Sequence, residues 1–420
     1  MTETSAPNLF ETFKNNETFD VVIIGAGMVG ASVALGVSDL GLSVLVVDSF
    51  VFEPTELSYT PSYDARSTAI AWGSKEILDQ LGVWSRVTEH ASPISQVHVS
   101  EKGRFGVTKM SADELKFEAL GYVVPNQWLG QCLMQSLTEK KVPLCAPAKV
   151  TMIETESQYR RIHLENISDS SRQQKSIQAQ LIIIADGTHS STAKLLGIES
   201  HAETYGQHAL IANVTTELPN EGVAYERFTR QGPLALLPLD THTSALVWTH
   251  DSKNIQTFLE MEERAFCAAL EEAFGERLGR ITRSGKRNAY PLQLVRAKEQ
   301  FRPGVVLLGN AAHSLHPVAG QGFNLALRGV ASCLEMLKTA GHANNNIGEL
   351  SHLKQFVDGL AHDQAKTIAF SDQVVKLFGH RSSLVSLGRD VGLVALDNLP
   401  MLKALFASQA MGLAGKKAQF

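Results

Sequence analysis

The sequence predicts an α/β fold in which a parallel sheet is joined by an inserted antiparallel sheet and a helical C-terminal region. Three continuous apolar runs support the parallel sheet, and they cover residues 21–24, 181–184 and 305–308. Such runs are typical of strands that are buried on both faces. Residues 93–117 and 201–283 instead form short segments joined by turns, a pattern that favours antiparallel pairing.

Composition excludes several classes of protein. The 420 residues are 44% hydrophobic and 19% charged, with a formal net charge of -5, so we expect no binding to nucleic acid. The four cysteines show no CxxC spacing and no His/Cys cluster, so neither a disulfide framework nor a metal site is expected. The first residues are polar and acidic, and no apolar run approaches the ~20 residues of a membrane span. We therefore expect a cytoplasmic protein.

The first apolar run leads into a glycine pattern that predicts a dinucleotide site. Gly25 permits a tight turn, Gly27 lets a diphosphate approach the backbone, and Gly30 lets the following helix pack closely on the strand. The diphosphate would bind the free N–H groups at the positive end of that helix. A second apolar strand over residues 44–47 ends in Asp48, where a carboxylate accepts the hydroxyls of the adenosine ribose.

Two further candidates, Arg66 and Asn126, lie in the next part of the chain. Arg66 lies at the start of a helix predicted over residues 64–81, where it is either a solvated first-turn residue or a cation near the bound dinucleotide. Asn126 lies between a strand predicted over 122–124 and a helix predicted over 128–137. Helix capping is the more frequent reason for an asparagine at such a junction.

The second apolar run delivers Asp186 and Gly187 to the carboxyl end of its strand. Ligands of doubly wound sheets bind at this edge, so the pair is a candidate ligand site. The alternative is that Asp186 only caps the helix that follows.

The third apolar run is followed by Gly309-Asn310. After a short turn that contains His316-Pro317, a long helix is predicted to begin at Gly320-Gln321-Gly322. Glycines at a helix start let backbone N–H groups approach an electron-rich ligand. The histidines of this loop also have a purely structural interpretation. The apolar, slightly basic tail beyond Leu384 predicts either core packing or a face for a membrane or partner.

Together these motifs resemble the FAD-dependent aromatic hydroxylases, the group A flavoprotein monooxygenases of the 4-hydroxybenzoate hydroxylase type, over nearly the whole chain. The resemblance implies a discontinuous, Rossmann-like FAD domain over residues 18–92, 120–196 and 285–342. It implies a substrate domain over 93–119 and 197–284, and a helical C-terminal region over 343–420.

The resemblance also implies FAD as cofactor and NAD(P)H as a transient co-substrate. Asp186-Gly187 would serve both FAD and the passing nicotinamide, and Asn310 stands where most members carry an aspartate that binds the ribityl chain. Arg66 and Asn126 would contact the diphosphate and ribityl region. The predicted cofactor-binding residues are Gly25, Gly27, Gly30, Asp48, Arg66, Asn126, Asp186, Gly187, Asn310, Pro317, Gly320, Gln321, Gly322, Phe323 and Asn324.

Within this family, residues 64–66, 119–124, 226–229 and 316–325 are similar to the hydroxylases of ubiquinone biosynthesis. Gly-Asn-Ala-Ala at residues 309–312 is similar to the branch of the 2-octaprenyl-6-methoxyphenol hydroxylases. Two departures are Gly329, where relatives usually carry an aspartate after Arg328, and Lys194, where an arginine is common. The first departure leaves the pairing of that helix open.

The chemistry implied by the resemblance is carried by the flavin. NAD(P)H reduces FAD, O2 gives a C4a-hydroperoxide, and its distal oxygen passes to a polyprenylated phenol. The protein holds the ring, excludes water and orients the phenol. The sequence does not identify the base that accepts the phenol proton, although His316 is the nearest candidate. A polyprenyl substrate predicts an apolar tunnel lined from the inserted sheet by Phe228, Leu234 and Leu236.

Other functions remain open on the same fold. One alternative is an FAD hydroxylase of a soluble aromatic compound, or a prenyl reductase. A second is a non-catalytic prenyl-binding carrier, as the GDP-dissociation inhibitors illustrate. Expected partners besides the substrate and O2 are other ubiquinone-biosynthesis proteins or the surface of the inner membrane.

Overall fold

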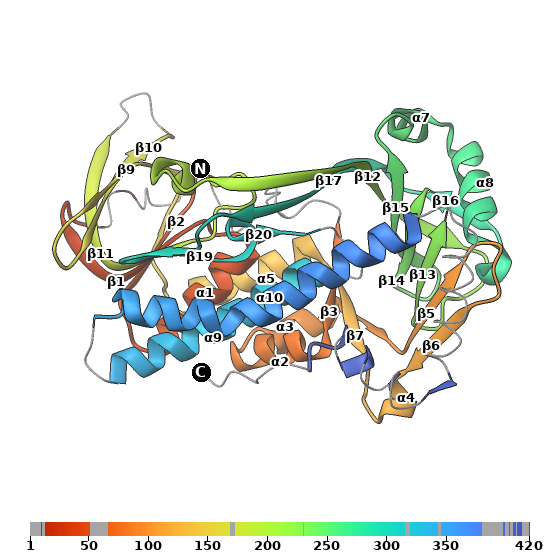
Figure 1. Ribbon diagram of the computed structural model, residues 1–420, viewed down its shortest axis with the longest axis horizontal. Coiled ribbons are helices and arrows are strands. Elements are labelled where there is room, and N and C mark those ends of the chain that lie inside the picture. The colour runs from red at the N-terminus through yellow and green to blue at the C-terminus, as the bar shows by residue number, and fades with distance from the viewer. Residues whose placement is uncertain are drawn as a thin grey trace, which may run out of the picture.

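The computed structural model describes residues 10, 13–50, 66–168, 173–229, 231–315, 320–342 and 346–379, with short stretches between 398 and 420. The helices are α1 (Met28–Asp39), α2 (Trp72–Gln80), α3 (Trp84–Val87), α4 (Ala112–Leu115), α5 (Asn126–Glu139), α6 (Ser191–Leu195), α7 (Ile255–Glu260), α8 (Glu263–Phe274), α9 (Gln321–His342) and α10 (Leu350–Gly379). Figure 1 shows one sheet at each end of an elongated molecule, with α9 and α10 running between them.

An eight-stranded sheet contains the three apolar runs. Its strands are β1 (Glu17–Ile24), β2 (Val44–Val47), β8 (Leu144–Cys145), β9 (Ala148–Thr155), β10 (Arg160–Asn166), β11 (Gln174–Ile184), β18 (Phe301–Arg302) and β19 (Val305–Leu307). β11 is parallel to both β1 and β19, with Ile184 opposite Ile24 and Leu307. The three runs therefore end at one edge of the sheet, which confirms the predicted parallel sheet.

A nine-stranded sheet forms the other end of the molecule. Its strands are β5 (Gln96–Glu101), β6 (Val107–Ser111), β12 (Ser200–Thr216), β13 (Val223–Thr229), β14 (Gly232–Pro238), β15 (Thr243–Asp251), β16 (Ile281–Ser284), β17 (Asn288–Ala297) and β20 (His313–Ser314). All described pairs are antiparallel except β5 with β13. Because β12 pairs with β17, strand pairing continues across the predicted domain boundaries, and the domain division stays a prediction.

A three-stranded sheet corrects one expectation. It consists of β3 (Ser67–Ala71), β4 (Ser92–Ile94) and β7 (Gly121–Pro125). The helix predicted over 64–81 is wrong for residues 67–71, because these pair with β7 and the helix begins only at Trp72. A short Ser/Thr/Ala segment has little intrinsic preference, so a distant strand decides its conformation.

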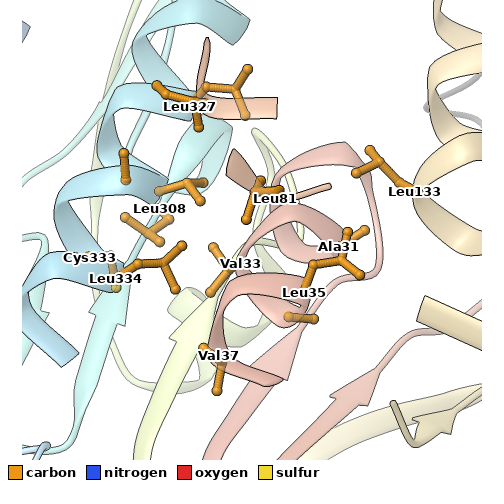
Figure 2. Packing of buried hydrophobic residues seen from close by; sticks show 14 of the residues in the cluster. Ala31, Val33, Leu35, Val37, Leu81, Leu133, Leu308, Leu327, Cys333 and Leu334 are labelled. Atoms are coloured by element: carbon orange, nitrogen blue, oxygen red, sulfur yellow. The ribbon is translucent and has the colours of Figure 1, made fainter. Parts of the chain in front are cut away.

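The core around α1 joins the N-terminal motif to the helix that follows the third motif. Figure 2 shows Val33 of α1 beside Leu334 of α9, with Leu133 of α5 on the opposite side of α1. A Cβ on Gly36 would overlap the Leu334 side chain, so this glycine permits the close helix packing. The N-terminus of α9 is thereby held close to the first motif.

Arg328 shows how α9 is paired despite the glycine at 329. Its Nε donates to Asp363 Oδ2 of α10 at 2.7 Å, and the same guanidinium reaches the hydroxyl of Thr367. Gly329 lies against Leu308 and Leu360 instead. The open question about the pairing of this helix is thus answered by an ion pair between Arg328 and Asp363 of α10.

The C-terminal region is described only in part. Ala407 and Met411 are buried, which favours core packing for this part of the tail, while residues 380–397 lie outside the described chain. No helix within the described residues is both long and apolar enough to cross a membrane.

Candidate active site

The turn after β1 has the geometry of a diphosphate site. Gly25 has a φ of 102°, and a Cβ there would lie 2.5 Å from the carbonyl oxygen of Ala185, at the end of β11. A Cβ on Gly30 would overlap the carbonyl oxygen of Gly25. No described side chain caps α1 at Gly27, so its first N–H groups are available to an anion.

Asp48 supports this turn from β2. Its Oδ2 accepts the Ala26 N–H at 2.6 Å, and its Oδ1 accepts the Phe50 N–H at 2.9 Å. Burial raises the pKa of this carboxyl, although the backbone donors oppose the rise. Each carboxylate oxygen has a second lone pair, so the predicted ribose contact fits beside these bonds and stays a prediction.

Asp186 caps the helix that follows it and leaves its second carboxylate oxygen without a partner in the described chain, so its ligand role stays a prediction. Its Oδ2 accepts the Thr192 N–H at 3.2 Å and so caps α6. Its Oδ1 is buried and has no partner within the described part of the chain. Gly187 has a φ of 92°, which brings the chain away from the sheet edge. Buried acceptors are nearly always paired, so this oxygen fits a bound hydroxyl such as one of the ribityl chain.

The third motif lies against the first. Gly309 has a φ of 59°, and a Cβ there would lie 3.0 Å from the Val29 side chain in the first turn of α1. Asn310 is exposed at this junction. His313 Nδ1 lies 3.2 Å from the Gly309 carbonyl oxygen, and burial lowers the pKa of His313, so a neutral imidazole donates this bond. The second predicted histidine, His316, and Pro317 lie outside the described residues.

The Asn324 side chain hydrogen-bonds the start of α9 to the backbone of β3. Its Nδ2 donates to the carbonyl oxygens of Ala69 at 2.9 Å and of Gly320 at 2.8 Å. Its Oδ1 accepts the Ala71 N–H at 2.8 Å. The side chain is 1% exposed and uses its amide fully on the backbone. We therefore interpret Asn324 as a residue that positions Gly320 and the first turn of α9, which together we call the glycine loop.

Asn324→Ala is expected to lower the affinity for FAD at least tenfold and to destabilise the fold by at least about 2 kcal/mol, because buried backbone groups of β3 lose their partners. FAD titration by flavin fluorescence and urea unfolding measure the two effects. Asn324→Asp keeps the acceptor for Ala71 and should fall between the wild type and Asn324→Ala. Unchanged FAD affinity in both variants would contradict the positioning role.

The other predicted cofactor residues in the first turn of α9, Gln321, Gly322 and Phe323, differ in how tightly they are packed. Gln321 is buried, and Phe323 packs on the core around α1. A Cβ on Gly322 would meet no atom of the described chain within 4 Å, so this glycine leaves open space. A flat flavin ring could approach the backbone closely at this open space. Cofactor binding by Gln321, Gly322 and Phe323 stays a prediction.

Arg66 and Asn126 lie at the same end of the β3–β7 pair, since Arg66 precedes β3 and Asn126 follows β7. The Arg66 carbonyl accepts the Asn126 N–H at 2.9 Å, and Thr68 donates to Asn126 Oδ1 at 2.6 Å. The described structure assigns no helix cap to the Asn126 side chain. The Arg66 guanidinium carbon lies 4.8 Å from the ring centre of Tyr290 on β17. The two residues thus lie at the boundary between the sheets, and their roles toward the cofactor stay predictions.

A cavity of about 270 Å³ lies between the nine-stranded sheet and the start of α9. β3, Gly320, Gln321 and Asn324 form one side of its wall. The other side comes mainly from alternate residues of the sheet, which are Val97, Val99, Ala224, Glu226, Phe228, Pro233, Ala235 and Leu237. The lining is predominantly apolar, as expected for a hydrophobic substrate.

The predicted tunnel lining is right for Phe228 and wrong for Leu234 and Leu236. Side chains of successive strand residues point to opposite faces, so Pro233, Ala235 and Leu237 reach the cavity. Leu234 and Leu236 pack instead in the core beneath α8.

Glu226 is a functional candidate that the sequence analysis did not predict as a site residue, although it opens the segment 226–229 that is similar to the ubiquinone hydroxylases. It occupies β13 between Ala224 and Phe228 on the face toward the cavity. Burial in apolar surroundings raises the pKa of its carboxyl to about 7. The sequence does contain a signal. Alternate residues of a strand share a face, so the sequence of β13 places the acid at 226 on the same face as the apolar Ala224 and Phe228.

Comparison with known proteins agrees with this geometry. The family model described as FAD binding domain matches residues 18–344. Ubiquinone hydroxylase UbiL of Rhodospirillum rubrum is 33% identical over 394 residues, covering 94% of this chain and 89% of that protein. The 3-demethoxyubiquinol 3-hydroxylase of Escherichia coli is 30% identical, covering 95% of this chain and 100% of that protein.

Solved structures agree on the fold. The p-nitrophenol 4-monooxygenase PnpA of Pseudomonas putida matches with a TM-score of 0.74 at 17% identity, covering 95% of this chain and 99% of that one. Pseudomonas aeruginosa PqsL in complex with 2-aminobenzoylacetate matches with a TM-score of 0.71 at 17% identity, covering 90% and 100%. The glycine turn, the unpartnered oxygen of Asp186 and these matches lead to one conclusion: the chain belongs to the FAD-dependent hydroxylases, in the family of the ubiquinone hydroxylases.

Proposed function

We propose that this enzyme hydroxylates a polyprenylated phenol in ubiquinone biosynthesis, with 2-polyprenyl-6-methoxyphenol as the substrate and with NAD(P)H and O2 as co-substrates. The observation that carries this proposal is the apolar cavity that joins the glycine loop of α9 to the nine-stranded sheet. The similarity to UbiL and to the demethoxyubiquinol hydroxylase supports the choice of a ubiquinone precursor.

The residues that would hold FAD follow from the three strand ends. The turn at Gly25, Gly27 and Gly30 fits the diphosphate, and Asp48 fits the adenosine ribose. Asp186 Oδ1, which is buried and unpartnered within the described residues, is an acceptor for a hydroxyl of the bound FAD. Bound FAD supplies the redox chemistry, since it takes electrons from NAD(P)H and activates O2 for transfer to the phenol.

The protein's contribution is binding and exclusion of water. The apolar walls of the cavity favour an aromatic ring with an apolar substituent and keep water from the reacting atoms. The loop at Gly320 and Gly322 would offer backbone N–H groups to negative charge on the reduced cofactor. By holding the phenol next to the bound cofactor, the cavity would make oxygen transfer effectively intramolecular and so lower its entropic cost.

The test is phenol-stimulated oxidation of NAD(P)H by the FAD-loaded enzyme, with the product identified by mass spectrometry. We expect 2-geranyl-6-methoxyphenol to stimulate oxidation and to gain one oxygen atom, and simple hydroxybenzoates to do neither. Stimulation by hydroxybenzoates alone would indicate a hydroxylase of soluble aromatics. Saturation of a chain double bond would indicate a prenyl reductase, and binding without turnover would indicate a carrier.

A further inference from the structure

Glu226 lies at the centre of the cavity wall formed by the nine-stranded sheet. On β13 it is opposite Ala235 of β14 and Val99 of β5, and both of these residues also line the cavity. Ala224 and Phe228 occupy the same face of β13. Its carboxyl group is therefore surrounded by apolar side chains on the strand itself and on both neighbouring strands.

Among the described residues that line the cavity, Glu226 alone carries a charged side chain. No hydrogen bond or ion pair of its carboxyl is found in the described part of the chain. The neighbouring cation, Arg227, points to the other face of β13, where its Nε donates to the Ala273 carbonyl. A carboxylate without a partner in apolar surroundings destabilises the fold, so its presence in the cavity points to a ligand that pairs with it.

The wall opposite Glu226 contains the start of α9. Gly320, Gln321 and Asn324 line the same cavity. If FAD is held by the three strand ends as proposed, these residues at the start of α9 would hold its flavin ring. An aromatic substrate in the cavity then lies between the flavin and Glu226.

We propose that Glu226 binds the hydroxyl group of the phenolic substrate and accepts its proton during hydroxylation. This inference rests on the proposed function. The phenol O–H bond breaks, the proton moves to a carboxylate oxygen of Glu226, and the bonding electrons stay on the phenol oxygen. The electron-rich ring then forms a C–O bond with one atom of O2 as the O–O bond breaks. The two electrons from NAD(P)H, together with protons from NAD(P)H and solvent, reduce the other atom to water. The hydroxylated carbon releases its hydrogen as a proton, and Glu226 returns its own proton to the phenol oxygen.

The chemistry of the carboxyl suits this role. Burial raises its pKa to about 7, so it is a stronger base than an exposed carboxylate and is still largely ionised above neutral pH. General bases are most effective when their pKa lies near the working pH. His316, the candidate nearest in sequence, lies outside the described residues, whereas Glu226 lines the cavity.

The first test compares FAD-loaded wild-type, Glu226→Gln and Glu221→Gln enzymes. Glu221 is exposed and lies outside the cavity lining, so its substitution removes the same charge near β13 as a control. For wild type and Glu221→Gln we expect kcat/KM for 2-geranyl-6-methoxyphenol to rise as pH increases through about 7. For Glu226→Gln we expect a loss of about 10²-fold or more and no such rise, with FAD content unchanged. An unchanged rate and pH profile in Glu226→Gln would overturn the inference.

The second test does not depend on turnover. It measures equilibrium binding of 2-geranyl-6-methoxyphenol and of its O-methyl ether, which cannot donate a hydrogen bond. The wild type should bind the phenol at least tenfold more tightly than the ether, and Glu226→Leu should lose this preference. Equal binding of the two by the wild type would overturn the inference. A clear preference without any hydroxylation would support the Glu226 contact while refuting the proposed function.

Discussion

Gly30→Ala is expected to lower the affinity for FAD by more than a hundredfold. The added methyl group would overlap the carbonyl oxygen of Gly25 and lie 3.0 Å from its carbonyl carbon, so the turn and α1 cannot keep their present packing. The first N–H groups of α1 would then no longer point together at the diphosphate. Titration of the apoprotein with FAD, followed by flavin fluorescence, measures the loss.

Gly359→Ala is the matched control for this prediction. It is the same chemical change within a helix, but a Cβ at Gly359 in α10 meets no described atom within 4 Å. We expect FAD affinity to be unchanged and stability to rise by up to about 1 kcal/mol, because alanine is the better helix former. Equal FAD affinity in the two variants would show that the turn at Gly25 does not hold the cofactor.

Glu226→Gln is expected to stabilise the apoprotein at pH 8 by about 3 kcal/mol relative to the wild type. The pKa of this carboxyl rises from 4.5 in the unfolded chain to about 7 in the fold, so ionisation opposes folding above pH 7. Between pH 4.5 and about 7 the folded protein keeps the proton on Glu226, whereas the unfolded chain has released it. The free energy of unfolding of the wild type therefore falls as pH rises through this range. The advantage of Glu226→Gln should therefore shrink by about 2 kcal/mol or more between pH 8 and pH 5.

Urea unfolding at the two pH values measures this difference, and Glu221→Gln, at an exposed residue outside the cavity lining, again serves as the control. A constant difference between wild type and Glu226→Gln from pH 5 to pH 8 would contradict the burial of an ionisable carboxyl in the cavity. The same substitution is expected to impair hydroxylation, so stability and activity should change in opposite directions.

Much of the cofactor side of the molecule can be predicted from the sequence because its signals are local. A β-branched run followed by glycines specifies a buried strand and a tight turn within a dozen residues. The parallel pairing of β1, β11 and β19 then brings the three runs to one edge. What the sequence does not indicate is that Gly25 contacts Ala185, since that depends on a register between strands about 160 residues apart.

The cavity wall is harder to predict because β14, which carries two of the residues predicted to line it, is buried on both faces. β14 has no polar face, so hydrophobicity does not indicate whether Leu234 and Leu236 or Ala235 and Leu237 face the cavity. Residues 67–71 become a strand only through pairing with β7. Glu226 lies in the segment 226–229 that resembles the family, but its place in the cavity is visible only once the fold shows which face of β13 meets the cavity.

The most direct test of the account is the fate of ¹⁸O2 during turnover of the FAD-loaded enzyme with NAD(P)H and 2-geranyl-6-methoxyphenol. The account predicts a hydroxylated phenol that carries one ¹⁸O atom for each NAD(P)H consumed. NAD(P)H oxidation without labelled product, or a product whose new oxygen comes from water, would contradict it.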